Sequence, residues 1–214
     1  VVSTGAKQCL ANIMLSLINP GDEVIIPAPY WVTYVEIVKL AGGVPVIVST
    51  DISSDFKITA QQLQEAISPE TKMLLYSSPC NPTGSLYSKE ELKSLVVVVS
   101  DEIYEHINFV SQHESSAQFD EVKDQTVIVN GVSKAFAMTG WRLGWMAAPE
   151  WIAKACVKMQ GQFTSGTSGI SQRAAIMALN SEPSKIHFMV EEFSKRRDLV
   201  LSLLKDIEGI KINK

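Results

Sequence analysis

Leu95-Val-Val-Val-Val-Ser-Asp-Glu-Ile-Tyr104 begins as a short, wholly apolar run and ends in polar residues. Such a run is typical of a strand that is buried on both faces, as in a parallel sheet with helices on both sides. The predicted strand leads directly into Asp101 and Tyr104. A carboxylate at the end of a buried strand has few structural uses, so Asp101 is a candidate functional residue.

Two other segments have the same plan. Leu74-Leu-Tyr-Ser-Ser-Pro-Cys-Asn-Pro-Thr-Gly84 is a predicted strand that opens into a loop with two prolines. Val127-Ile-Val-Asn-Gly-Val-Ser-Lys-Ala-Phe-Ala-Met-Thr-Gly-Trp-Arg142 is an apolar strand that ends in a turn of small residues. Ligands of an open parallel sheet bind beyond the carboxyl ends of its strands, where the following residues converge. The sequence therefore predicts one site that contains Asn81, Asp101, Tyr104 and Lys134.

Lys134 has Ser133 beside it and Arg142 eight residues later. An amine that can be deprotonated, which burial and neighbouring cations favour, and a fixed cation are what an enzyme needs to hold pyridoxal phosphate. The amine would form a Schiff base, and the cation would bind the phosphate. An ordinary solvated turn after a strand has the same kind of sequence, so this segment alone leaves both interpretations open.

The N-terminal segment Val1-Val-Ser-Thr-Gly-Ala-Lys-Gln8 predicts a strand end, a glycine turn and a helix to about Leu17. Backbone N–H groups at such a helix N-terminus form an anion site. The following residues alternate helix and strand patterns, which predicts α/β architecture with a mainly parallel sheet flanked by helices.

Capping boxes at Thr59–Gln62 and Ser88–Glu91 open two helices, and Lys72–Tyr76 is the strand after the first of them. After Pro149 the pattern is helical, over about 151–162, about 170–179 and from about 185 onward. Six apolar residues of the last helix predict one buried stripe: Ile186, Val190, Phe193, Val200, Leu204 and Ile207. We therefore expect a large domain over residues 1–180 and the beginning of a smaller α+β domain over 181–214.

Composition excludes several functional classes. The chain has 214 residues, 46% of them hydrophobic, which is enough for a substantial core. A net charge of −4 without a basic tract argues against nucleic acid, and the apolar runs fall short of the roughly 20 residues of a membrane span. Cys9, Cys80 and Cys156 lack metal spacing and fit a reducing cytosol. The histidines His106, His113 and His187 have no matching partner set in the sequence, so we expect no metal site or catalytic triad.

Three motifs together resemble a known enzyme family. Ser-Pro-x-Asn-Pro-Thr-Gly (78–84), Ser-Asp-Glu-Ile-Tyr-Glu (100–105) and Ser-Lys-Ala-Phe-Ala-Met-Thr-Gly-Trp-Arg-Leu-Gly (133–144) look like the class I pyridoxal phosphate aminotransferases. These enzymes have the aspartate aminotransferase fold, fold type I of the pyridoxal phosphate enzymes. The chain is most similar to the bacterial and plastid branch that contains aspartate and prephenate aminotransferases. The likeness covers essentially the whole chain, in family order.

The resemblance implies roles for the clustered residues. Lys134 would form the Schiff base and then act as base and acid of the proton shift. Asp101 would pair with the protonated pyridine nitrogen, which keeps the ring an electron sink. Tyr104 and Asn81 would hydrogen-bond the ring oxygen, and Asn81 would also reach the substrate carboxylate. Arg142 would bind the phosphate with both ends of its guanidinium, with Ser133 beside it.

In the resembled family the N-terminal glycine turn is the phosphate cup, which assigns Gly5, Ala6 and Lys7 to the cofactor phosphate. Lys7 would also meet the distal carboxylate of acidic substrates. Trp31, which follows the strand Val24–Ile26, would stack on the cofactor ring and border the substrate. Two structural alternatives stay open: Lys7 as a surface cation and Trp31 as a core residue.

The implied activity is transfer of an amino group between an amino acid and a 2-oxo acid, by a cytoplasmic homodimer. We expect aspartate, glutamate or another acidic substrate, although the sequence does not rank the possible pairs. Other enzymes of the same fold, such as β-lyases or synthases, would use the same lysine, aspartate and arginine. A non-catalytic fragment that binds pyridoxal phosphate is a further alternative.

The sequence departs from the family pattern in three ways. It starts at Val1 and stops at Lys214 inside predicted elements, so we expect it to be part of a longer protein. It offers no residue for the arginine that binds the substrate α-carboxylate in the family. The helix opened at Ser88 runs directly into the strand at Val96, where a connection of about 2–6 residues is usual, so on the order of ten residues are expected to be missing at the Leu95–Val96 join. Residues skipped in the numbering, which we expect, and a true deletion are the two explanations.

Overall fold

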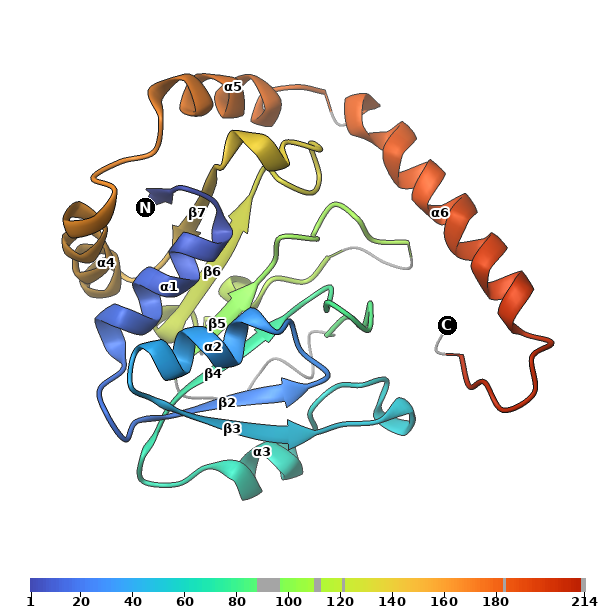
Figure 1. The fold of residues 1–214 in the computed structure, drawn as a ribbon, viewed down its shortest axis with the longest axis horizontal. Coiled ribbons are helices and arrows are strands. Elements are labelled where there is room, and N and C mark those ends of the chain that lie inside the picture. The colour runs from blue at the N-terminus through green and yellow to red at the C-terminus, as the bar shows by residue number, and fades with distance from the viewer. Residues whose placement is uncertain (88–96, 110–112, 121, 183, 213–214) are drawn as a thin grey trace.

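The computed structural model describes residues 1–87, 97–109, 113–120, 122–182 and 184–212. These residues form a seven-stranded sheet in the order β1-β7-β6-β5-β4-β2-β3, flanked by helices (Figure 1). The strands are β1 (Val2–Ser3), β2 (Glu23–Ala28), β3 (Val44–Ser49), β4 (Thr71–Ser77), β5 (Val97–Asp101), β6 (Thr126–Gly131) and β7 (Gly144–Ala147). The α-helices are α1 (Ala6–Leu17), α2 (Thr33–Leu40), α3 (Ala60–Ala66), α4 (Glu150–Phe163), α5 (Gly169–Leu179) and α6 (Ser184–Leu204).

The sheet is mainly parallel, which confirms the predicted class. Strands β3, β2, β4, β5 and β6 run parallel to their neighbours, whereas β7 is antiparallel to both β6 and β1. The strand register places Asp101 level with Ser77 of β4 and with Val129 of β6. Residues that follow these strands therefore emerge at one edge of the sheet.

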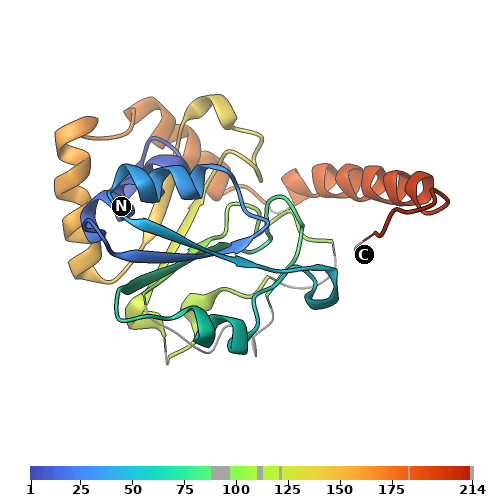
Figure 2. The same ribbon diagram turned by 60° about the horizontal axis from the view of Figure 1, so that its bottom comes forward.

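Alternate strand residues divide the core into two layers. Val24, Met73 and Val99 pack with α1, α2 and α4 on one face of the sheet. Ile25 and Leu74, their neighbours in sequence, pack with α3 and the segment around Phe119 on the other. This is the period of two expected for strands that are buried on both faces. In Figure 2 the blue helices α1 and α2 lie above the strands, and α3 lies below them.

Local signals in the sequence are reproduced closely. Thr59 and Gln62 form the predicted capping box of α3, with each side chain bonded to the backbone of the other residue. The predicted helix to Leu17 is α1, and the three helices after Pro149 are α4, α5 and α6. The box at Ser88–Glu91 and the Leu95–Val96 join lie outside the described residues. No helix of the described part of the chain is both long and apolar enough to cross a membrane.

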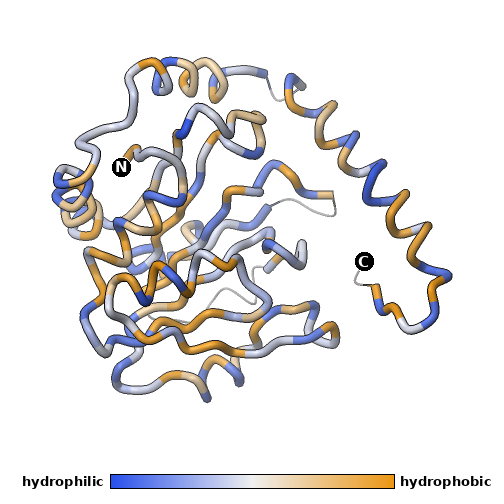
Figure 3. The backbone as a smooth tube through the Cα atoms, viewed as in Figure 1, coloured by the Kyte–Doolittle hydropathy of each residue, from blue (hydrophilic) through white to orange (hydrophobic). Residues whose placement is uncertain are grey.

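The predicted buried stripe of α6 is wrong for this chain. None of the described residues of α6 is buried, and Phe193 and Val200 are 45% and 52% exposed. Hydrophobic and hydrophilic segments alternate along α6 in Figure 3, and in Figure 1 the helix runs along the edge of the molecule, away from the sheet. An apolar periodicity shows that a helix has a face suited to burial. It does not show that the chain supplies a surface to cover that face.

Candidate active site

A cavity lies at the carboxyl ends of the strands, where the sequence predicts the site. Its lining includes nine of the predicted residues: Ala6, Lys7, Trp31, Asn81, Asp101, Tyr104, Ser133, Lys134 and Arg142. Gly5, the tenth, adjoins the cavity through its contact with Arg142. The cavity volume is about 190 Å³, smaller than the roughly 300–1,000 Å³ expected for a small-ligand pocket. A second hollow of about 810 Å³ shares Asn81 and Tyr104 with it.

Asp101 is the buried acid of the site, with 3% of its surface exposed. The Tyr34 hydroxyl donates to Oδ2 at 2.8 Å, and the Ile103 N–H donates to Oδ1 at 3.3 Å. Burial raises the pKa of Asp101 from 3.8 to about 6, against the opposing effect of these two hydrogen bonds. A cation placed in the cavity would favour the ionised carboxylate. The site is therefore matched to a ligand that carries positive charge near Asp101.

Tyr34 holds Asp101 from α2. Burial and the neighbouring Asp101 charge raise the pKa of Tyr34 well above its ordinary value of 10, so the phenol remains a hydrogen-bond donor. Trp31 packs against Tyr34 edge to face, with ring centroids 5.6 Å apart and an interplanar angle of 87°. Trp31 is half-buried and lines the cavity, so it is available to a ligand as well as to the core.

Lys134 follows β6 in a tight turn, in which the Ala137 N–H donates to the Lys134 carbonyl at 3.1 Å. Its Nζ atom lies 5.4 Å from the centroid of the Tyr104 ring, inside the cavity lining. The lysine is exposed, which contradicts the expectation that burial favours its neutral form.

Gly5 and Arg142 lie in close contact beside the cavity. Gly5 has φ of +87°, and a Cβ atom added to it would lie 2.4 Å from the Arg142 Nη2 atom. A side chain at position 5 is therefore disfavoured by the backbone and excluded by the guanidinium. No side chain caps α1 at Gly5, and the Gln8 N–H donates to the Gly5 carbonyl at 3.1 Å, so the Ala6 and Lys7 N–H groups are the ones suited to an anion.

Lys7 extends from the same turn of α1 toward Trp31, with Nζ 4.8 Å from the centroid of the indole. Asn81 follows β4, and its N–H donates to the Ser77 hydroxyl at 3.3 Å. The sequence predictions omitted four residues that line the cavity: Tyr34, Ser77, Ile103 and Thr139. The strand-end rule that selected Asp101 would also have selected Ser77, whereas Tyr34 carries no such signal.

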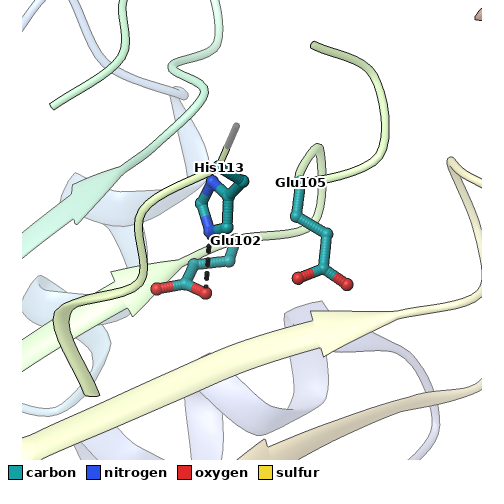
Figure 4. Close-up of side chains that lie close together, drawn as sticks. All are labelled: Glu102, Glu105 and His113. Carbon is teal, nitrogen blue, oxygen red and sulfur yellow. Dashed lines mark hydrogen bonds and ion pairs between the residues drawn. The ribbon is translucent and has the colours of Figure 1, made fainter. Parts of the chain in front are cut away.

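A separate polar cluster surrounds Glu102, on the face of the sheet opposite the cavity, because successive strand residues point to opposite faces. The buried Glu102 carboxylate accepts hydrogen bonds of 3.0 Å from Ser100, Ser115 and His113 Nε2. Figure 4 shows the His113–Glu102 bond with Glu105 beside it. Ligand atoms of Glu102, Glu105 and His113 lie within 4.8 Å of one another, but Glu102 is already bound by these donors. His113 thus bonds a residue eleven positions earlier, a contact that the spacing of the histidines does not indicate.

Comparison with known proteins agrees with this fold. A profile of the family described as aminotransferase class I and II matches residues 1–214. The chain is 45% identical, over 226 aligned residues, to the bifunctional aspartate aminotransferase and glutamate/aspartate-prephenate aminotransferase of Petunia hybrida, covering 100% of the chain and 47% of that relative. It is also 45% identical to the probable aspartate/prephenate aminotransferase of Rhizobium leguminosarum bv. phaseoli, over 98% of the chain and 55% of the relative.

The chain spans about half the length of the curated relatives it matches. The Petunia alignment is longer than the 214 residues of the chain, so that relative has residues within the matched stretch that this chain lacks.

Solved structures give the same result. The aspartate aminotransferase of Rhizobium meliloti superimposes with a TM-score of 0.96 at 42% identity, over 100% of this chain and 57% of that one. The aromatic aminotransferase of Pyrococcus horikoshii OT3 superimposes with a TM-score of 0.95 at 36% identity, over 100% of this chain and 60% of that one. Because the family profile spans the whole chain and the relatives share 42–45% of its residues, the chain belongs to the aminotransferase class I and II family.

Proposed function

We propose that this chain carries the cofactor site of a pyridoxal phosphate-dependent aminotransferase that acts on an acidic amino acid and a 2-oxo acid. One observation supports the proposal above the others. A primary amine, a buried carboxyl and an arginine at an uncapped helix N-terminus line or adjoin a single cavity. Each group has a different counterpart on pyridoxal phosphate: the aldehyde, the ring nitrogen and the phosphate.

The residues fit the cofactor by charge. Arg142 and the N–H groups after Gly5 would hold the phosphate, with Ser133 beside them. Asp101, whose pKa burial raises to about 6, would be stabilised as a carboxylate by a protonated ring nitrogen. Trp31 would cover the ring, while Asn81 and Tyr104 would donate to its oxygen. Bound pyridoxal phosphate supplies an aldehyde for the amino group and a ring that accepts electrons.

The protein groups then have defined tasks. Lys134 Nζ would hold the cofactor through its amine and, when released, would take a proton from the substrate α-carbon and return it. Asp101 would favour the protonated form of a ring nitrogen bound beside it. Tyr34 orients that carboxylate through its 2.8 Å hydrogen bond, and so fixes the end of the site at which charge accumulates.

Lys7 supports the choice of an acidic substrate. Its Nζ atom stands over Trp31 at the cavity wall, where a distal carboxylate of a substrate would meet it. Relatives of the chain are named aspartate and glutamate/aspartate-prephenate aminotransferases, which fits a dicarboxylic substrate. A role of Lys7 with the phosphate alone is the alternative.

Assembly and domain structure complete the proposal. We infer that the protein is cytoplasmic and forms a homodimer. Lys134 is exposed and the cavity is smaller than a cofactor site needs, so groups from a second subunit would complete the site. We also infer that residues 1–180 form the large cofactor-binding domain and that 181–214 open a smaller one. The absence of buried residues among the described part of α6 supports this division.

The test is a half-reaction in the protein reconstituted with pyridoxal phosphate. Aspartate should convert the bound cofactor to pyridoxamine phosphate with release of one 2-oxo acid, and a 2-oxo acid should reverse the change. A β-lyase or synthase would release ammonia or a product without accumulating the pyridoxamine form. A non-catalytic fragment would bind the cofactor and leave its absorbance unchanged when aspartate is added.

A further inference from the structure

Gln160, near the end of α4, makes four hydrogen bonds with its side-chain amide although only 5% of its surface is exposed. Its Oε1 atom accepts from Ser3 Oγ at 2.5 Å and from Asn12 Nδ2 at 3.1 Å. Its Nε2 atom donates to the Val2 carbonyl at 2.9 Å and, more weakly, to the Ser165 carbonyl at 3.5 Å. The amide thus joins α4 to the short strand β1 and to α1.

Strand β1 needs this support because it has only two residues, Val2 and Ser3, paired with Trp145 and Gly144. So short a ladder fixes the chain weakly. Directly after it, the Ser3 carbonyl accepts the Gly5 N–H at 2.8 Å, which folds the backbone into the turn before α1. The Gln160 contacts to Val2 and Ser3 therefore act on the residues that set the position of Gly5.

Gly5 has little space for a side chain or for a shift toward Arg142. Its α-carbon is packed so closely against Arg142 that even a methyl group would overlap the guanidinium. A second connection reinforces the turn at the surface: Gln8 accepts from the Thr4 N–H at 2.6 Å and donates to Thr164 Oγ1 at 2.8 Å. Both glutamines tie the turn to α4 and the residues after it, in the interior and at the surface.

We propose that Gln160 is a positioning residue that holds the Ser3–Gly5 turn against Arg142, and so sets the affinity of the site for the phosphate of its ligand. The inference rests on the proposed function in one respect, namely that the turn and Arg142 bind the cofactor phosphate. Gln160 is not one of the described residues that line the cavity, so it would act on the ligand through the Ser3–Gly5 turn. A fully satisfied buried amide is suited to this, since it fixes several backbone positions at once.

The experiment compares two ligands that differ only in the phosphate. Dissociation constants of pyridoxal phosphate and of pyridoxal are measured for the wild-type chain and for Gln160→Leu in phosphate-free buffer. We expect the substitution to raise the dissociation constant of pyridoxal phosphate by about five- to tenfold, the effect of one neutral hydrogen bond. The dissociation constant of pyridoxal should not change. Gln62→Leu is the matched control, because Gln62 also bonds the backbone, at Thr59 and Ser49, far from the site. It should change neither constant.

Gln160→Leu leaves buried polar groups without partners and could fail to fold. Ser3→Ala then tests the same link, because it removes one hydroxyl and leaves Gln160 bonded to Asn12. A selective loss of pyridoxal phosphate binding in Ser3→Ala, and also in Gln160→Leu where that variant folds, supports the inference. Equal weakening of both ligands, or no weakening in Ser3→Ala, would overturn it and leave Gln160 as part of the fold only. Equal affinity of the wild type for both ligands would instead overturn the proposed phosphate site itself.

Discussion

Replacing Asp101 with asparagine should stabilise the cofactor-free protein at neutral pH while it weakens cofactor binding. Asp101 is buried beneath the cavity, and its pKa is raised from 3.8 to about 6. An acid whose pKa is higher in the folded state binds more protons there than when unfolded. Its ionisation therefore costs stability as the pH rises from the unfolded pKa to the folded one. Asparagine has no charge to bury and can still accept a hydrogen bond.

The size of the effect follows from the two pKa values. A difference of about 2 corresponds to about 3 kcal/mol of unfolding free energy, fully developed above the folded pKa. At pH 8 the unfolding free energy of cofactor-free Asp101→Asn should therefore exceed that of the wild type by as much as about 3 kcal/mol. At pH 5 the difference should be roughly half of that. Tyr34→Phe should act in the opposite direction, since it removes the 2.8 Å hydrogen bond that favours the carboxylate.

Urea unfolding at pH 5 and pH 8, without and with pyridoxal phosphate, measures these differences. The cofactor should stabilise the wild type at pH 8 more than it stabilises Asp101→Asn, because its ring nitrogen supplies the cation that the carboxylate lacks. An advantage of Asp101→Asn that is the same at both pH values would refute the argument. It would mean that packing, and not the buried charge, separates the two proteins.

Three substitutions test the other parts of the site. Lys134→Ala should abolish the covalent adduct trapped by borohydride and leave the urea midpoint unchanged, whereas an adduct on a different lysine would disprove the assignment. Lys7→Ala should lower kcat/KM for aspartate and glutamate by roughly 10- to 150-fold, the effect of about 1.5–3 kcal/mol for a charge-assisted contact, with little change for alanine or phenylalanine. Equal losses for all four substrates would confine Lys7 to the phosphate or the fold. Gly5→Ala, with a backbone φ of +87° and Arg142 2.4 Å from the new methyl group, should weaken pyridoxal phosphate binding more than pyridoxal binding; unchanged affinity would place the phosphate elsewhere.

The strand ends were predictable because they follow from local rules. A buried strand is an apolar run, and the residue after it must lie at the carboxyl edge of a parallel sheet. That reasoning was enough to place Asn81, Asp101 and Lys134 around one cavity. The antiparallel direction of β7 was not predictable in this way, because a short apolar run does not reveal its direction.

Contacts between distant segments were beyond local rules. Tyr34 reaches Asp101 from a helix 67 residues earlier, and His113 bonds Glu102 across a separation of 11 residues. Neither pair has a characteristic spacing in sequence. The exposure of α6 was missed for a different reason, since amphipathic periodicity records a preference for burial and contains no information about the partner surface.

The order Ser100, Asp101, Glu102 at the end of β5 also bears on how the strand is aligned. Val97, Val98 and Val99 are identical, so a shift of one position along the sheet would replace valine with valine at positions 97 and 98, and only at position 99 would a polar residue, Ser100, enter the core. The same shift would move Asp101 into the place of Ser100, which is buried in the layer beneath the sheet, and Glu102 toward the cavity. Both carboxylates would then leave the donors that now bond them, and a buried charge without such donors is costly. The polar residues that serve the site are thus also the ones that select the correct pairing of a strand whose apolar part cannot select it.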